Sequence, residues 1–294
     1  MTKSNRRRFL QVTGAASLTA AFAHSGYATE SRKSFDGMVG ITTGGGLGKK
    51  RERGELNLTT LPKYMRDELG MQLIDVNTRW LDSLDPKFLR EARSAADDAG
   101  CFFSNLKVND PVSGDLYSKN RKEREQAFAK CRNLIKAAEI LGTRWIRFTV
   151  PKAVASDPIA HRELAVYAEE RKIQLLVENA GWLREKPDSI AKLVKAIGQN
   201  VAACPDTGNW DDPVRDLGLR KSFPNAASCD FKIWEMDDDW NHARYDLKKC
   251  FDIGHSAGYR GPWIIELMQD DAKFAASARY VRDLLAGWIK QSSK

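Results

Sequence analysis

The chain has 294 residues, of which 42% are hydrophobic, and its 47 Lys and Arg against 39 Asp and Glu give a formal net charge of +8. This length suits one large α/β domain or two smaller ones. The positive excess is small for the length, and no block of basic residues lies between aromatic stacking residues. Composition therefore argues against nucleic-acid binding.

Residues 1–28 have the pattern of an export signal. The run NRRRFLQ at positions 5–11 precedes a weakly apolar stretch, VTGAASLTAAFA, and Gly26 and Ala28 are the small residues of a cleavage site. The segment resembles a twin-arginine signal, although Asn5 replaces the usual Ser or Thr and Gln11 the usual Lys. We expect a mature domain over 29–294 that is periplasmic or otherwise exported.

The remainder of the chain shows no membrane or disulfide signature. Cleavage removes Lys3, Arg6, Arg7 and Arg8 and no acidic residue, which leaves a net charge of +4. No run of 18 apolar residues follows, so no membrane contact is expected after cleavage. The five cysteines are an odd number without paired spacing, which does not predict a disulfide framework.

Strand and helix patterns alternate along the rest of the chain. Strands are predicted at 38–43, 71–77, 101–108, 145–150, 173–179, 201–206, 227–234 and 262–267. Helices are predicted at 58–69, 86–99, 121–141, 159–171, 187–197, 213–221, 241–257 and 271–290. Eight βα units without a linker predict an α/β fold, a single-domain (β/α)8 TIM barrel, with a doubly wound open sheet as the alternative.

Four acidic residues each lie at the end of an apolar run in the C-terminal half. They are Glu178 in IQLLVEN, Asp206 in VAACPDTG, Asp230 in ASCDFKIW and Glu266 in PWIIEL. Each is separated from the next by about one strand, one helix and two loops. In a closed parallel barrel these side chains converge at the C-terminal end of the strands.

These segments resemble the xylose-isomerase-like sugar phosphate isomerase/epimerase superfamily from about Gly37 onward. The matching pieces are LLVEN, PDTGN, the strand with Asp230-Phe231-Lys232 in place of a usual His-x-Lys, and GYRGPWIIEL. The resemblance implies a TIM barrel whose strand ends hold one divalent metal. The implied ligands are Glu178, Asp206, Asp230 in the His position, and Glu266. Asn209 is a second departure, since relatives often have His there.

An all-oxygen ligand set favours Mn²⁺, Mg²⁺ or Ca²⁺ over Zn²⁺. His161, His242 and His255 fall in or at the edges of predicted helices, and a helix-cap role is expected for His242. Four carboxylates around one dication leave excess negative charge, which Lys232 and an inward-pointing Arg147 would reduce. The sequence leaves open whether Asp230 keeps or ends metal binding.

Four tryptophans follow strand ends, where indole rings can pack on the C–H faces of sugars. They are Trp80, Trp182, Trp210 and Trp234, and with Arg147 and Asn209 they form the predicted substrate-binding set. The alternative is that they fill space between loops and helices. The glycine-rich run at 43–50 fits no phosphate-loop motif, and we expect a mobile loop over the barrel with a solvated Lys49-Lys50-Arg51.

The predicted function is a metal-dependent sugar or keto-sugar isomerase or epimerase. Glu178 and Glu266 would remove and return the proton alpha to a carbonyl through an enediolate, and Lys232 would polarise the oxygen. The alternatives are a lyase that cleaves 3-keto-glycosides by β-elimination and a non-catalytic carbohydrate-binding barrel. The expected partner is a small-molecule carbohydrate, and the sequence leaves a homo-oligomer open.

Overall fold

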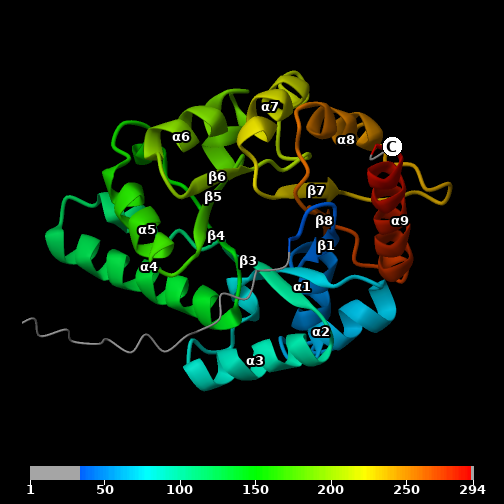
Figure 1. Cartoon of the computed structure of the whole chain (residues 1–294), viewed down its shortest axis with the longest axis horizontal. Helices are drawn as coiled ribbons and strands as arrows, with labels where there is room; N and C mark the ends of the chain where they lie inside the picture. The colour runs from blue at the N-terminus through cyan, green and yellow to red at the C-terminus, as the bar shows by residue number, and fades with distance from the viewer. Residues whose placement is uncertain (1–33, 293–294) are drawn as a thin grey trace, which may run out of the picture. The chain divides into compact units, whose positions relative to one another are not determined.

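Short apolar and β-branched runs form eight parallel strands within residues 34–292, the part of the chain that this computed structural model describes (Figure 1). The strands are β1 (Val39–Thr42), β2 (Leu73–Asn77), β3 (Phe102–Val108), β4 (Trp145–Phe148), β5 (Gln174–Glu178), β6 (Val201–Cys204), β7 (Cys229–Ile233) and β8 (Trp263–Leu267). Each lies inside a predicted strand. The predicted signal segment at 1–28 lies outside the described residues, and the chain from Phe35 onward forms one unit.

The strands are hydrogen-bonded in the order β6-β5-β4-β3-β2-β1-β8-β7, all parallel. Between β6 and β7, parallel bridges join Ala203 to Ala226 and Asp206 to Asp230. There the amide of Asp230 donates to the carbonyl of Pro205 at 3.0 Å. These contacts bring the two ends of the sheet together, so the predicted single-domain TIM barrel is confirmed.

Helices follow the strands and cover the outside of the sheet (Figure 1). The α-helices are α1 (Gly45–Glu52), α2 (Leu61–Tyr64), α3 (Pro86–Asp98), α4 (Arg121–Leu141), α5 (Ile159–Glu169), α6 (Ser189–Ile197), α7 (Arg215–Ser222), α8 (Leu247–Ser256) and α9 (Phe274–Ser292). One π-helical turn, η1 (Met65–Leu69), continues α2. Short 3₁₀ turns are η2 (Thr78–Trp80), η3 (Gly114–Tyr117), η4 (Lys152–Ala155), η5 (Gly181–Arg184) and η6 (Phe223–Asn225). No helix among residues 34–292 is long and apolar enough to span a membrane.

The predicted helix at 241–257 begins later than expected. The carboxylate of Asp246 accepts the amide of Lys249 at 3.0 Å and caps α8, so the helix begins at Leu247. Before this helix, an antiparallel β-bridge joins Met236 to His242, so His242 lies in an ordered turn of the β7–α8 loop and not in the helix. The expected helix-cap role of His242 is therefore wrong.

The glycine-rich segment at 43–50 is also different from its prediction as a mobile loop. It forms α1, whose Leu47 is fully buried. Gly45 has φ +53 and lies against the carbonyl of Leu267, while Gly46 lies against the carbonyl of Gln269 and the ring of Phe274. Glycine has a low helix propensity, so close packing against the β8–α9 segment stabilises this helix.

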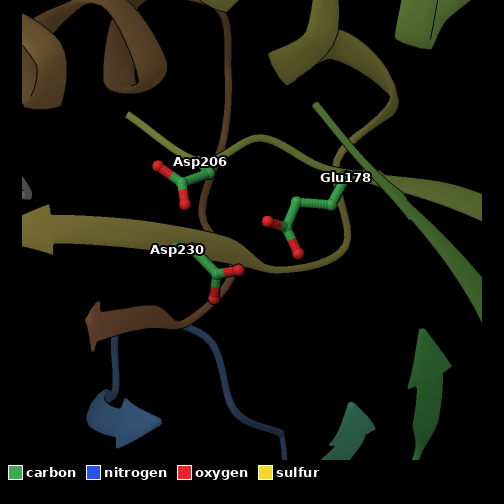
Figure 2. A group of neighbouring side chains, drawn as sticks. All are labelled: Glu178, Asp206 and Asp230. Atoms are coloured by element: carbon green, nitrogen blue, oxygen red, sulfur yellow. The ribbon is translucent and has the colours of Figure 1, made fainter. Parts of the chain in front are cut away.

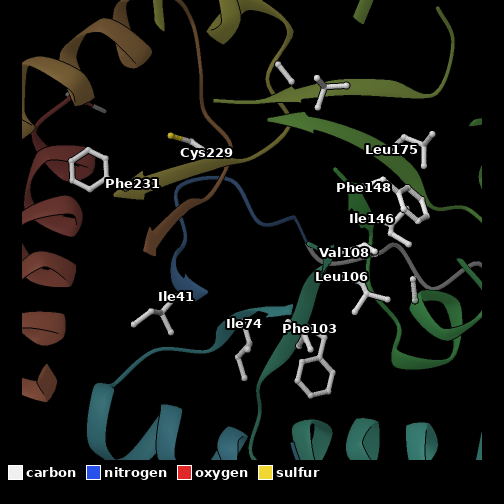
Figure 3. Packing of buried hydrophobic residues seen from close by; sticks show 14 of the residues in the cluster. Ile41, Ile74, Phe103, Leu106, Val108, Ile146, Phe148, Leu175, Cys229 and Phe231 are labelled. Carbon is white, nitrogen blue, oxygen red and sulfur yellow. The ribbon is translucent and has the colours of Figure 1, made fainter. Parts of the chain in front are cut away.

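Side chains alternate between the barrel interior and the helix layer. The outward-facing residues, among them Ile41, Ile74, Leu106, Ile146 and Phe231, form the main hydrophobic core with the helices (Figure 3). A second apolar cluster contains Leu73, Trp145, Leu176, Ala202, Cys204 and Ile264. Two residues after a member of this cluster, and therefore on the same inward side, come polar residues, namely Asp75, Arg147, Glu178, Asp206 and Glu266. The apolar cluster therefore lies beneath a polar layer at the C-terminal end of the strands.

We expect Gly46→Ala to destabilise the fold by about 1–3 kcal/mol or more, because a Cβ at this position overlaps the backbone carbonyl of Gln269. Gly48→Ala is the matched control. Its Cβ meets only the carbonyl of Thr43 at 3.5 Å, and alanine favours a helix, so it should leave stability unchanged or raise it by up to about 1 kcal/mol. Urea unfolding measures both. Equal effects of the two substitutions would contradict the packing of α1.

Candidate functional site

Three carboxylates meet at the C-terminal end of the barrel (Figure 2). Glu178 ends β5, Asp206 lies two residues after β6, and Asp230 lies on β7. One oxygen from each lies within 4.8 Å of the others, and all three side chains are buried. The structure thus brings together three of the four predicted ligands.

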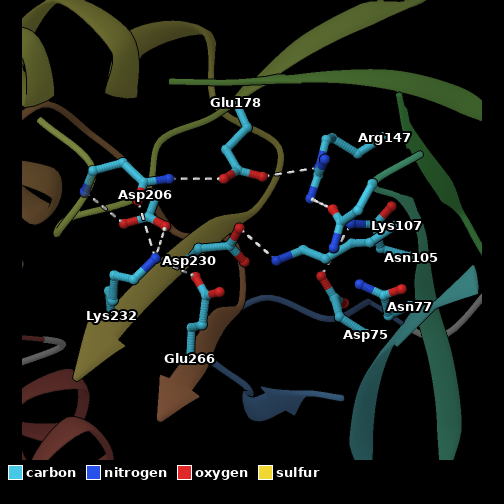
Figure 4. A network of polar contacts seen from close by, with 12 residues as sticks. Asp75, Asn77, Asn105, Lys107, Arg147, Glu178, Asp206, Asp230, Lys232 and Glu266 are labelled. Carbon is cyan, nitrogen blue, oxygen red and sulfur yellow. Dashed lines mark hydrogen bonds and ion pairs between the residues drawn. The ribbon is translucent and has the colours of Figure 1, made fainter. Parts of the chain in front are cut away.

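The fourth predicted ligand, Glu266 on β8, lies beside this triad and is joined to it by Lys232. The ammonium of Lys232 lies 3.2 Å from Glu266 Oε2 and 3.3 Å from Asp206 Oδ2 (Figure 4). Lys232 and Glu266 are register partners on β7 and β8, which explains their contact. Burial raises the pKa of Glu266, but attraction by Lys107 and Lys232 outweighs it and lowers the pKa to about 2. Glu266 is therefore ionised at neutral pH.

Two further cations neutralise the remaining carboxylates. Lys107 on β3 donates to Asp230 Oδ2 at 2.6 Å, and both side chains are almost completely buried. Arg147 on β4 points inward as predicted, and its Nε lies 2.8 Å from Glu178 Oε2, without the angle of a hydrogen bond. Lys107 was missed by sequence reasoning. It could have been found because Asn105 and Lys107, two polar residues two positions apart in a predicted buried strand, must point to the same side of the sheet.

Burial also raises the pKa of two of the carboxyl groups, because the nearby cations do not fully offset the cost of burying a negative charge. Burial raises the pKa of Asp230 to about 7, against the attraction of Lys107. Burial likewise raises the pKa of Asp206 well above its ordinary value, although Lys232 opposes the shift. The pKa of Lys232 rises above its ordinary value because attraction by Asp206 and Glu266 outweighs desolvation. The lysine is a stable cation here.

Asp75 on β2 is a fourth buried acid, beside the partly exposed Glu266, and the sequence analysis did not identify it. Its carboxylate accepts hydrogen bonds from the hydroxyl of Ser104 and, at 3.0 Å, from the amide of Asn105 (Figure 4). Burial raises the pKa of Asp75, and the charges of Lys107 and Arg147 oppose that shift. Asp75 therefore extends the polar layer across the barrel interior to β2.

Asn209, which the sequence predicts as a substrate-binding residue, lies in the site and connects the triad to Lys232. Its Nδ2 donates to Glu178 Oε1 at 2.9 Å, and its Oδ1 accepts from Lys232 Nζ at 3.0 Å. The turn after β6 fixes this position, because Asp206 Oδ1 accepts the amides of Gly208 and Asn209 at 2.7 and 3.0 Å. The PDTGN sequence thus holds Asn209 over the carboxylates.

The four tryptophans occupy different environments. Trp80 is 1% exposed and its indole N–H donates to the carbonyl of Thr43, which places it in the core. Trp182 is half-buried and donates to the carbonyl of Val150. Trp210 and Trp234 line a cavity of about 650 Å³ that also contains Asn209. These two tryptophans share the cavity with Asn209, although Trp210 is itself only 2% exposed.

Histidines and cysteines take no part in this cluster. His161 is buried, its pKa lowered to about 4 by burial, and its Nδ1 contacts the hydroxyl of Tyr117 at 2.8 Å. His242 lies in the β7–α8 loop, and His255 stacks on Phe251 in α8. All five cysteines are buried and free.

The residues of the triad fit a hard divalent cation. They supply three carboxylates within 4.8 Å of one another. Asp230 Oδ1 is a buried oxygen without a hydrogen-bond partner, and such an oxygen is available as a ligand, whereas Glu178 Oε2 lies 2.8 Å from Arg147 Nε. The buried acidic triad can therefore bind a metal ion.

The chain belongs to the xylose isomerase-like TIM barrel family, whose model matches residues 67–290. The fold is similar to that of D-psicose 3-epimerase from Clostridium cellulolyticum H10, solved with D-tagatose (15% identity, 86% of this chain and 99% of that one, TM-score 0.67). The fold is also similar to that of a xylose isomerase-like TIM barrel protein from Mycobacterium smegmatis in complex with magnesium (18% identity, 87% of this chain and 97% of that one, TM-score 0.63). A third similar structure is that of the probable 3-DHS dehydratase AsbF from Bacillus anthracis (12% identity, 87% of this chain and 99% of that one, TM-score 0.61). No curated protein matches the chain.

We expect Lys107→Met to lower stability by about 3–5 kcal/mol, because it leaves the buried carboxylate of Asp230 without its cation. Added Mn²⁺ should restore more stability to this variant than to the wild type, since ammonium and metal compete for Asp230. Thermal unfolding with and without Mn²⁺ measures both effects.

Lys192→Met is the matched control, because Lys192 pairs with Asp188 on the surface. Its unfolding midpoint should stay near that of the wild type at every metal concentration. If Mn²⁺ stabilised Lys107→Met and the wild type equally, competition between the ammonium and the metal would be ruled out.

Proposed function

We propose that the protein is a metal-dependent isomerase or epimerase of sugars or keto-sugars. The observation that supports this most is the arrangement of the two glutamates. Glu178 and Glu266 reach toward the centre of the site from opposite sides, with Asp206 and Asp230 between them (Figure 4). A carbon held between two carboxylates can lose a proton to one and receive a proton from the other.

Glu178, Asp206 and Asp230 would hold one divalent cation, with Glu266 as a further ligand. When bound, this cation supplies positive charge to the carbonyl and adjacent hydroxyl oxygens of the substrate. Mn²⁺, Mg²⁺ and Ca²⁺ suit this oxygen-only set better than Zn²⁺.

The chain's own groups carry out the proton transfers. One glutamate takes the proton alpha to the carbonyl, and the electron pair of the broken C–H bond moves toward the carbonyl oxygen to give an enediolate. The other glutamate, which takes up a proton from solvent before this step, returns that proton to the opposite face and so inverts the carbon. If it returns the proton to the neighbouring carbon instead, the adjacent hydroxyl proton passes to the former carbonyl oxygen and the carbonyl moves. Lys232, a permanent cation 3.2 Å from Glu266, stabilises the negative charge on oxygen.

Asn209 and Arg147 position Glu178 for this task. Asn209 donates to one carboxylate oxygen, and Arg147 lies against the other. A carboxylate fixed at both oxygens keeps its direction toward the substrate, and fixed geometry accounts for much of enzymatic rate enhancement. The role of Lys232 is supported by its contact with Glu266. Arg147 and Asn209 were predicted to bind substrate, and their contacts with Glu178 add a positioning role to that prediction.

A lyase acting on 3-keto-glycosides is the second candidate. The cavity of about 650 Å³ beside the triad has room for a group attached to the sugar. Removal of the proton at C2 would then expel the substituent at C1, and the C2–H electrons would form the new double bond. A signal for export would favour glycosides and free sugars over sugar phosphates as substrates, and we propose export by the twin-arginine route.

Glu178→Gln and Glu266→Gln should each lower turnover by at least about 10²-fold while the fold remains intact. The assay follows exchange of solvent deuterium into keto-hexoses in the presence of Mn²⁺, with circular dichroism as the folding check. Glu91→Gln, an exposed position on α3, is the matched control and should keep wild-type turnover. Full activity in either site variant would rule out the two-glutamate mechanism, and sugar binding without exchange would indicate a binding barrel.

A further inference from the structure

The cavity beside the triad contains three arginines whose environments differ. Arg184 pairs with Asp211 at 2.8 Å, and Arg215 pairs with Asp212 at 2.5 Å. Arg244 lines the same cavity, and no carboxylate among residues 34–292 pairs with it. The cavity wall thus presents one uncompensated positive charge.

Arg244 is held in place by stacking on Trp234. Its guanidinium carbon lies 3.9 Å from the centroid of the indole ring. The loop that bears both residues is braced by His242, whose Nε2 accepts the amide of Trp234 at 3.2 Å. A stacked guanidinium keeps the N–H groups at its edge available, so it can bind a carboxylate through two parallel hydrogen bonds without prior rearrangement.

The same indole ring connects Arg244 to the proposed reaction centre. The ammonium of Lys232 lies 5.1 Å from its centroid, so the two cations are no further apart than the sum of these two distances. Lys232 is already neutralised by Asp206 and Glu266, whereas Arg244 is not. Lys232 and the glutamates do not line the cavity, but Asn209 does, and it is hydrogen-bonded to both Lys232 and Glu178. A sugar-sized molecule that reaches the glutamates past Asn209 would have its far end in the cavity, beside Arg244.

We propose that Arg244 is a specificity-determining residue that binds the carboxylate of a sugar acid. This inference rests on the proposed function for the position of the reacting carbons. A carboxylate carries one negative charge, which matches the single unpaired cation, whereas a phosphate carries about −1.5 to −2 near neutral pH and calls for more. The substrate class is then the keto-sugar acids rather than neutral sugars or sugar phosphates.

The test compares binding and turnover in the full chain and in two variants. Arg244→Gln removes the unpaired charge. Arg184→Gln removes an equal charge from the same cavity, but one already paired with Asp211. Calorimetry measures binding of D-glucuronate, D-glucose and D-glucose 6-phosphate, and an exchange assay compares D-fructuronate with D-fructose.

We expect the wild type to bind glucuronate more tightly than glucose or glucose 6-phosphate, and Arg244→Gln to weaken glucuronate binding by about 10-fold to 100-fold, the usual effect of losing a hydrogen bond to a charged group. Glucose binding should not change in that variant. Arg184→Gln should retain the preference for glucuronate to within about 3-fold, because general electrostatic attraction is weak at an exposed site.

Three results would overturn the inference: no preference for glucuronate over glucose, a preference for the phosphate, or an equal loss in both variants. The calorimetric measurement of binding does not depend on turnover. A chain that binds glucuronate through Arg244 but exchanges no proton would support this inference and reject the proposed isomerase. Exchange on fructose that Arg244→Gln leaves unchanged, without any preference for acids, would support the isomerase and reject the inference.

Discussion

The structure depends on balancing charge inside the C-terminal end of the barrel. Asp75, Glu178, Asp206 and Asp230 lie in one buried layer with Lys107, Arg147 and Lys232. Glu266, whose side chain is 18% exposed, joins this layer through Lys232. An unpaired charge in such a place costs several kcal/mol, so each cation lies against at least one carboxylate. The acids still outnumber the cations, and this excess favours the binding of a further positive charge.

Strand register determines which charges meet. Lys232 and Glu266 are direct neighbours on β7 and β8, and they form an ion pair. Lys107 and Arg147 are also direct neighbours, on β3 and β4, and like charges at such positions repel. Each therefore extends to a carboxylate on another strand, Lys107 to β7 and Arg147 to β5, and the contacts across the barrel hold the polar layer together.

The sequence was sufficient for the fold and for four of the five acids, because both follow from local patterns, whereas Asp75 was missed. Alternating βα units predicted the barrel, and acids after apolar runs predicted Glu178, Asp206 and Asp230. Lys107 could not be placed in the same way, since its partner Asp230 is 123 residues away in the chain. The helix α1 was missed for a similar reason. Its glycines disfavour a helix locally, and contacts with Leu267, Gln269 and Phe274 stabilise it.

The pairing of Lys107 with Asp230 also explains how a carboxylate can occupy the position for which the family resemblance of the sequence implies a histidine. Replacing a neutral imidazole by a carboxylate adds one negative charge to a buried layer that already has an excess of them. Lys107 supplies one positive charge at 2.6 Å and cancels that addition. The second oxygen, Asp230 Oδ1, has no partner among the described residues and is still available to a cation. A carboxylate at this position is therefore compatible with metal binding, because the lysine engages only one of its two oxygens.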